Sequence, residues 1–241
     1  NTGNNAGLFG YAGCSVRDLA IVNCNIKSSG AFIGAIAGHA KDIENCYATG
    51  TIEITGAAVS YAGGIVGASS GVVKGCYSTV KIIADSDSNT AKSSGIVGAA
   101  YIVRNCVALN SELNAETAKR ISCEELSTKE NNYALQSMKV NGAEVTTDKG
   151  ASELNGADLI IKDGKLYKDD GTEFTWSGFD RNIWTLPTEK GELPRLKYSS
   201  KVSLNLNEQA QTENDSLLPG CLTDKCKLTI THHDSTPSKP D

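Results

Sequence analysis

The most chemically versatile residues in this chain are its eight cysteines. Four of them recur along the first half of the chain, at Cys24, Cys46, Cys76 and Cys106. A thiol can ligate a metal, form a disulfide or fill a core as a small apolar group. No pair among the eight has the two-residue spacing of a zinc knuckle, so we predict no metal site and no cofactor. Stacked in equivalent positions, the four would form an inward column of thiols, and disulfides between neighbouring coils are the alternative in an oxidising compartment.

A separate pair, Cys221 and Cys226, lies near the C-terminus with four residues between its members. We interpret this pair as a local disulfide that closes a turn. The adjacent histidines His232 and His233 follow it, so a metal site is the alternative.

Two further positions recur beside the cysteines. Glu44, Lys74 and Arg104 each lie two residues before a cysteine. On the outer face of a sheet such a row could bind the acid group of a glycan, or its opposite charges could fix the register between neighbouring strands. Tyr47 and Tyr77 each follow a cysteine directly, so they form either an aromatic row for stacking sugars or packing over a turn.

Residues suited to catalysis are sparse in the sequence. It contains no His-Glu-x-x-His motif and no aspartate pair at the spacing of a glycosidase, and His39 stands alone after Gly38. The net charge of −5 argues against nucleic acid and against anionic lipid as partners. No apolar run approaches 18 residues, so we expect no membrane span. These features favour a non-enzymatic protein.

The elements that must position these residues are four repeats. A box of glycine and small apolar residues closes on Gly10, Gly38, Gly67 and Gly98, which are 28, 29 and 31 residues apart (38−10, 67−38, 98−67). A period near thirty indicates a solenoid. Each repeat carries three short runs of alternating character, such as residues 51–54, which are typical of half-buried strands. We therefore predict an all-β fold, a parallel β-helix, with glycines and asparagines at corners of positive φ.

The first repeat departs from the others in spacing. The closing glycine precedes the cysteine by 8, 9 and 8 residues in repeats two to four (46−38, 76−67, 106−98) but by 14 in the first (24−10). We therefore predict about six extra residues in the first coil, around Tyr11 to Val16.

The box, followed by a short strand and Asn45-Cys46-Tyr47, resembles the GLUG repeat of bacterial secreted and cell-surface proteins. Downstream, Trp176, Phe179-Asp180, Trp184 and the stretch 191–196 are similar to the module that closes such repeats, with Gly178 lengthening the first gap by one residue. The resemblance covers roughly residues 6 to 198, and Ala35 replaces the first glycine of the second box. It implies a right-handed parallel β-helix, a surface or secreted location and a role as an adhesin.

The resulting organisation has three parts. We expect β-helix repeats over residues 1–115, final coils and an irregular β-rich C-terminal cap over 116–198, and an extension or linker over 199–241 where another module could begin. Within the cap region we predict a short helix between 118 and 133 and hairpins at Asn141-Gly142 and Asp163-Gly164. The chain starts without Met or a signal peptide, which we interpret as a fragment of a longer protein.

Together these features predict a monomeric, surface-exposed or secreted bacterial module that binds a host or microbial glycan or protein for adhesion. Two alternatives remain open. One is a carbohydrate-active β-helix enzyme, a lyase or hydrolase that uses the charged row. The other is a passive spacer in a larger surface protein.

Overall fold

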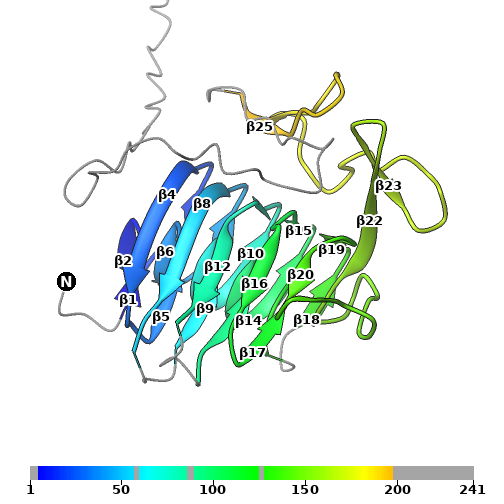
Figure 1. Cartoon of the computed structure of the whole chain (residues 1–241). Helices are drawn as coiled ribbons and strands as arrows, with labels where there is room; N and C mark the ends of the chain where they lie inside the picture. Colours follow the sequence, from blue (N-terminus) through cyan, green and yellow to red (C-terminus); the bar gives the residue numbers. More distant parts are fainter. Residues whose placement is uncertain (1–4, 57–59, 86–89, 125–127, 198–241) are drawn as a thin grey trace, which may run out of the picture.

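The computed structural model describes residues 5–56, 60–85, 90–124 and 128–197 (Figure 1). These residues form an all-β parallel solenoid of about four turns and contain no helix. The predicted fold class is confirmed. Cys221, Cys226, the two histidines after them and the predicted extension from residue 199 lie outside the described residues.

Three sheets form the walls of the solenoid, and their strands stack in five layers along one axis. Sheet A contains one short strand per layer: β1 (Asn5–Ala6), β5 (Phe32–Gly34), β9 (Tyr61–Gly63), β13 (Lys92–Ser94) and β17 (Thr117–Lys119). Sheet B contains β2 (Phe9–Ala12), β6 (Ala37–Ala40), β10 (Val66–Lys74), β14 (Val97–Arg104) and β18 (Thr128–Glu130), with β3 (Val16–Arg17) and β7 (Ile43–Glu44) as shorter pieces. Sheet C contains β4 (Ala20–Ser28), β8 (Tyr47–Ile54), β11 (Tyr77–Ser78), β12 (Lys81–Ala84), β15 (Val107–Ala108), β16 (Glu112–Asn114), β19 (Tyr133–Leu135) and β20 (Lys139–Val140).

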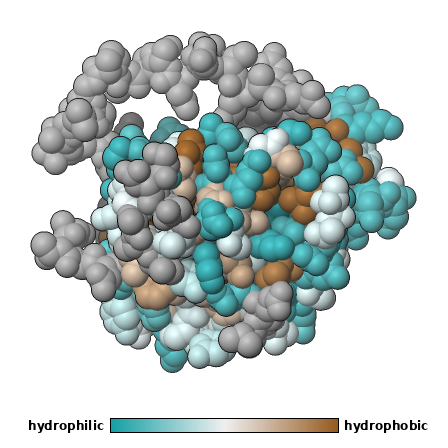
Figure 2. Space-filling model, turned by 60° about the horizontal axis from the view of Figure 1, so that its bottom comes forward, coloured by the Kyte–Doolittle hydropathy of each residue, from teal (hydrophilic) through white to brown (hydrophobic). Residues whose placement is uncertain are grey.

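Inward-facing and outward-facing side chains alternate along the strands, and the inward-facing ones form the core. Ile43, Val73 and Val103 pair in register in successive layers and are fully buried, while their sequence neighbours on either side face outward. Because equivalent positions stack directly, each inward residue type becomes a column along the axis. The face in Figure 2 is correspondingly mostly hydrophilic, with hydrophobic residues in separate areas.

The corners between sheets B and C carry the predicted positive-φ residues. Asn45 (φ 52°), Gly75 (φ 61°) and Asn105 (φ 53°) occupy successive layers, and Asp18 and Asn131 extend the series at both ends. Asn and Gly tolerate this left-handed conformation at the lowest cost. The side chains also bond between layers, since Asn45 Nδ2 donates to Asp18 Oδ1 at 3.0 Å.

The glycines that close the boxes serve a different purpose from the one predicted. Gly10, Gly38, Gly67 and Gly98 are not among the positive-φ residues. A Cβ added to Gly67 would lie 2.4 Å from the backbone nitrogen of Ile33, because sheets A and B approach each other closely there. Gly38, Gly67 and Gly98 have no room for a side chain, whereas at Gly10 the nearest atom would be 3.3 Å away, so the corner interpretation of the box glycines is wrong.

The cysteine column is confirmed for three of its four predicted members. Tyr77 pairs with Tyr47 and with Val107, which places the preceding residues Cys46, Cys76 and Cys106 one above another, all fully buried. Cys24 does not belong to this column, since it pairs with Gly50.

In the first layer, Ala20 pairs with Tyr47, so the preceding residue Leu19 occupies the cysteine position. Leu19 follows Gly10 by nine residues (19−10), in line with the other repeats. The prediction of about six extra residues in the first coil is therefore wrong. The column accepts leucine as well as cysteine, so the search for a cysteine selected Cys24 in place of Leu19.

The C-terminal region closes the far end of the solenoid and then turns back. Both predicted hairpins are confirmed, as β20 with β21 (Ala143–Glu144) and as β22 (Ala157–Lys162) with β23 (Lys165–Lys168). β22 pairs with β19 and so extends sheet C beyond the fifth layer. The predicted helix between 118 and 133 is wrong, because the described residues there belong to β17, β18 and turns.

The cap also has a part along the flank of the solenoid. After β23 the chain runs back beside sheet C, where β24 (Trp184–Thr185) pairs with β25 (Arg195–Leu196). Trp184 packs on Tyr47 with ring centroids 6.0 Å apart, so the cap reaches the second layer. The large aromatic residues assigned to the cap therefore cover a side of the solenoid as well as its end.

Candidate functional site: the charged row on sheet B

The predicted charged row exists on the outer face of sheet B. Lys74 pairs in register with Glu44 on one side and with Arg104 on the other. The register extends the row to Arg17 in the first layer and Glu130 in the fifth. Sequence reasoning missed these two ends because no cysteine follows them; counting back two residues from Leu19 and Asn132 would have found both.

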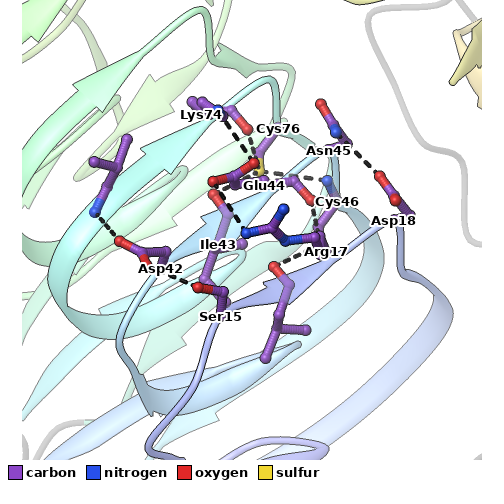
Figure 3. Close-up of polar contacts among 12 residues, drawn as sticks. Ser15, Arg17, Asp18, Asp42, Ile43, Glu44, Asn45, Cys46, Lys74 and Cys76 are labelled. Atoms are coloured by element: carbon purple, nitrogen blue, oxygen red, sulfur yellow. Dashed lines mark hydrogen bonds and ion pairs between the residues drawn. The ribbon is translucent and has the colours of Figure 1, made fainter. Parts of the chain in front are cut away.

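Glu44 is the centre of the row's first half. Its carboxylate lies 3.1 Å from Lys74 Nζ and 3.8 Å from an Arg17 guanidinium nitrogen (Figure 3). The Glu44 side chain is 17% exposed, whereas those of Lys74 and Arg17 are 36% and 57% exposed. Ion pairs this accessible to water stabilise a fold by about 0–1 kcal/mol, so their main effect is on register.

Asp42 anchors the loop beside the row. Its carboxylate accepts hydrogen bonds from the backbone N–H of Val72 at 2.9 Å and from the Ser15 hydroxyl at 2.8 Å (Figure 3). These two bonds, the backbone one first, lower the pKa of Asp42 below its ordinary value. The carboxylate therefore remains charged at neutral pH and connects three successive layers.

In the second half of the row Arg104 lies between Lys74 on one side and Glu130 on the other. Arg104 is exposed and lies one layer from Lys74, whose ammonium group is already paired with Glu44 on the opposite side. Within the described ranges no ion pair involves Arg104. Adjacent like charges on one sheet face repel each other, and an anion placed between them would relieve the repulsion.

An exposed aromatic ring lies on the same strand as Arg104. Tyr101 is 66% exposed and lies three residues before Arg104 on β14. It is the single residue opposite Ser70 and Gly71 of β10, where the register of the two strands shifts. Such a bulge bends β10 and interrupts the regular ladder opposite Tyr101. β14 therefore carries both the cation of Arg104 and an accessible aromatic ring.

The predicted aromatic row forms but does not face solvent. Tyr47 and Tyr77 stack with centroids 4.9 Å apart and planes 4° apart, and their exposed fractions are 1% and 0%. Trp176, Phe179 and Trp184 of the cap lie against them. A sugar cannot reach these rings, so the packing alternative holds and the ligand-binding assignment of both tyrosines is wrong.

The thiols beneath the row are structural. All six described cysteines are free, so no disulfide joins neighbouring layers among them. Burial, followed by the neighbouring thiols of Cys46 and Cys106, raises the pKa of Cys76 well above its ordinary value. Cys46 donates to the carbonyl oxygen of Glu44 at 3.2 Å. A buried, protonated thiol of this kind is unreactive.

Among the residues that the structure describes, no group of three or more His, Cys, Asp or Glu is arranged to hold a metal ion. The same part of the chain has no helix that could span a membrane. Comparison with protein-family models, with curated proteins and with solved structures found no match.

Proposed function

We propose that this chain is a non-enzymatic binding module of the GLUG type, displayed on a bacterial surface or secreted, which attaches to acidic glycans. The observation that carries the proposal is the position of Arg104 beside Lys74 in the row. Arg104 forms no ion pair among the described residues, although Glu130 is its neighbour in register on the other side, and the exposed ring of Tyr101 lies three residues away on the same strand. A uronic acid or sulfated sugar supplies an anion for the two cations, and its ring has an apolar face for the tyrosine.

The scaffold suits such a role. Strands of neighbouring layers lie about 4.8 Å apart and are held by backbone hydrogen bonds on both sides, so the cations are fixed relative to each other before a ligand arrives. A preorganised site loses little side-chain freedom on binding, which favours affinity for an extended, repetitive polymer.

Binding assays with three polysaccharide probes test the proposal. We expect polygalacturonate, a carboxylate polymer, or heparin, a sulfate polymer, to bind and the neutral polymer dextran not to bind. Arg104→Ala and Lys74→Ala should each weaken binding by roughly tenfold or more, since a hydrogen bond to a charged group contributes about 1.5–3 kcal/mol. Added salt should weaken the interaction as well.

Lys81→Ala is the matched control. It removes one positive charge from sheet C, where Lys81 pairs with Glu112 at 2.8 Å, and leaves the row intact. The proposal is wrong if Lys81→Ala lowers binding as much as Arg104→Ala, or if neither acidic polymer binds. Turnover of a bound polysaccharide would replace it with the enzyme alternative.

A further inference from the structure

The C-terminal cap contains a pocket that shares no residue with the charged row. It has a volume of about 480 Å³, and its lining comes from the segment that follows β23 and includes β24 (Figure 1). Three buried aromatic residues, Phe174, Trp176 and Trp184, belong to its wall. A pocket of this size, with aromatic and polar residues in its lining, is typical of a site for a small molecule.

Trp176 has a strained backbone conformation at this wall. Its φ is 57°, in the left-handed region that bulky residues rarely adopt. The ring packs against Phe174 and Phe179, with centroids 5.1 Å apart in both pairs, and these contacts hold the residue in place. Such strain is concentrated at ligand sites, where it fixes the geometry of the site before a ligand binds.

Two cations lie at the pocket on neighbouring backbone segments. Arg181 is part of a turn in which the backbone N–H of Trp184 donates to the carbonyl oxygen of Asp180 at 2.8 Å. The backbone N–H of Lys197 donates to the carbonyl oxygen of Ile183 at 3.0 Å, which holds the second cation beside this turn. Both residues are exposed, and neither forms an ion pair within the described ranges.

The acidic residue of the lining is already paired. The carboxylate of Glu173 lies 2.9 Å from Lys165 Nζ, on the neighbouring strand β23. Asp180 is next to Arg181 in the chain but does not line the pocket, and its carboxylate accepts the backbone N–H of Asn182 at 2.8 Å. The polar part of the lining is completed by three threonines, Thr175, Thr185 and Thr188. The pocket therefore suits a ligand that carries both an anionic group and hydroxyl groups.

We propose that this pocket binds a short acidic oligosaccharide. The guanidinium of Arg181 can bind a sugar carboxylate through two parallel hydrogen bonds, and Lys197 adds a second positive charge. Threonine hydroxyls both donate and accept, as the hydroxyl groups of a sugar require. The apolar part of the wall faces the C–H groups of the sugar ring. This site goes beyond the charged row and does not depend on it.

Tryptophan fluorescence of the full chain measures binding at this pocket, because the chain has two tryptophans and both line it. We expect digalacturonate to change the emission until it saturates, and the neutral disaccharide maltose to leave it unchanged. Arg181→Ala should raise the dissociation constant of digalacturonate by about tenfold or more, because it removes a charged hydrogen-bond donor. Lys190→Ala is the control, since it removes an exposed cation of the same segment that does not line the pocket.

Three further measurements separate this site from its alternatives. Arg104→Ala in the charged row should leave the fluorescence titration unchanged, so the two sites are tested independently. Arg181→Ala should unfold at the same urea concentration as the parent protein, because the side chain is exposed. Benzoate, an acid without hydroxyl groups, should bind more weakly than digalacturonate.

The inference is wrong if digalacturonate leaves the emission unchanged, or if benzoate binds as tightly as the sugar. It is also wrong if Arg181→Ala and Lys190→Ala have equal effects. Loss of the fluorescence response in Arg104→Ala would likewise assign the binding to the charged row in place of the pocket.

Discussion

Tyr77 donates a hydrogen bond from its hydroxyl to the carbonyl oxygen of Pro194 at 2.7 Å, across a sequence separation of 117 residues. The bond joins the third layer of the solenoid to the returning C-terminal segment. Tyr77 is fully buried, so the bond satisfies a hydroxyl that would otherwise lose its contact with water. The C-terminal segment is therefore an integral part of the fold and covers the tyrosine pair.

Replacing Trp184 by alanine should show how strongly the stability of the fold depends on the C-terminal segment. The indole is 1% exposed and lies within about 6 Å of both Tyr47 and Tyr77, measured between ring centroids (6.0 and 5.9 Å). Loss of a buried aromatic residue costs about 3–5 kcal/mol, so the free energy of unfolding in urea should fall by that amount. Tyr101→Ala, an exposed aromatic position, should change it by about 0.5 kcal/mol or less. Equal losses in the two variants would mean that the segment does not pack on the tyrosines.

The solenoid could be predicted from the sequence because its residue pattern repeats at a nearly constant interval. The repeat of glycine, short strands and cysteine indicates which residues occupy equivalent positions in successive layers. Two Gly-containing turns indicate local hairpins. Contacts of this kind lie within one repeat or join adjacent ones. The charged row at Glu44, Lys74 and Arg104 could be predicted for the same reason.

The parts that sequence reasoning missed depend on distances between segments. The return of Trp184 onto Tyr47 joins residues far apart in the chain and leaves no periodic signal. The role of Gly67 depends on how closely two sheets approach, which composition does not encode. Leu19 was missed because its column also accepts residues other than cysteine, and a search for cysteine finds Cys24 instead.

Gly67→Ala tests the close approach of sheets A and B. The new Cβ would lie 2.4 Å from Ile33 N and 2.7 Å from the Gly38 carbonyl oxygen, and both are backbone atoms that cannot move aside alone. We expect the free energy of unfolding to fall by roughly 3 kcal/mol, the upper range for overpacking. Gly10→Ala is the matched control in the same column, since its Cβ meets nothing closer than 3.3 Å. A mild effect at Gly67 would show that the sheets can separate easily.

Stability should decrease at alkaline pH because of the buried thiols. Burial raises the pKa of Cys123 from 9.0 to about 12, and the thiol donates to the carbonyl oxygen of Ser93 at 2.9 Å. Since the pKa is higher in the folded state, the stabilising contribution is complete below pH 9 and is lost as pH rises from 9 towards 12.

Urea titrations under reducing conditions at several pH values measure this effect. Each such group contributes a slope of about 1.4 kcal/mol per pH unit. Cys76 and, above pH 10, Tyr77 add to the decrease, since burial raises both pKa values. The Cys123→Ala variant should lose stability less steeply between pH 9 and 11 than the parent protein. Identical slopes would contradict the assignment to Cys123.

The ion pair of Arg120 and Asp158 closes the core behind the last complete layer. The Arg120 side chain is 0% exposed and its guanidinium lies 2.8 Å from Asp158 Oδ1. The same guanidinium donates to the carbonyl oxygens of Leu135, Asn155 and Gly156. Desolvation by burial lowers the pKa of Arg120, while the carboxylate of Asp158 opposes this change.

Asp158→Ala should therefore be strongly destabilising. The variant leaves a buried positive charge without its counter-ion, which costs about 3–5 kcal/mol, and the urea midpoint should fall accordingly. Glu173→Ala is the control, because it removes a carboxylate whose side chain is 50% exposed and which pairs with Lys165 at 2.9 Å. A pair so accessible to water contributes about 0–1 kcal/mol. If the two variants unfold at the same urea concentration, Arg120 has access to water and the end of the solenoid is less tightly closed than its hydrogen bonds indicate.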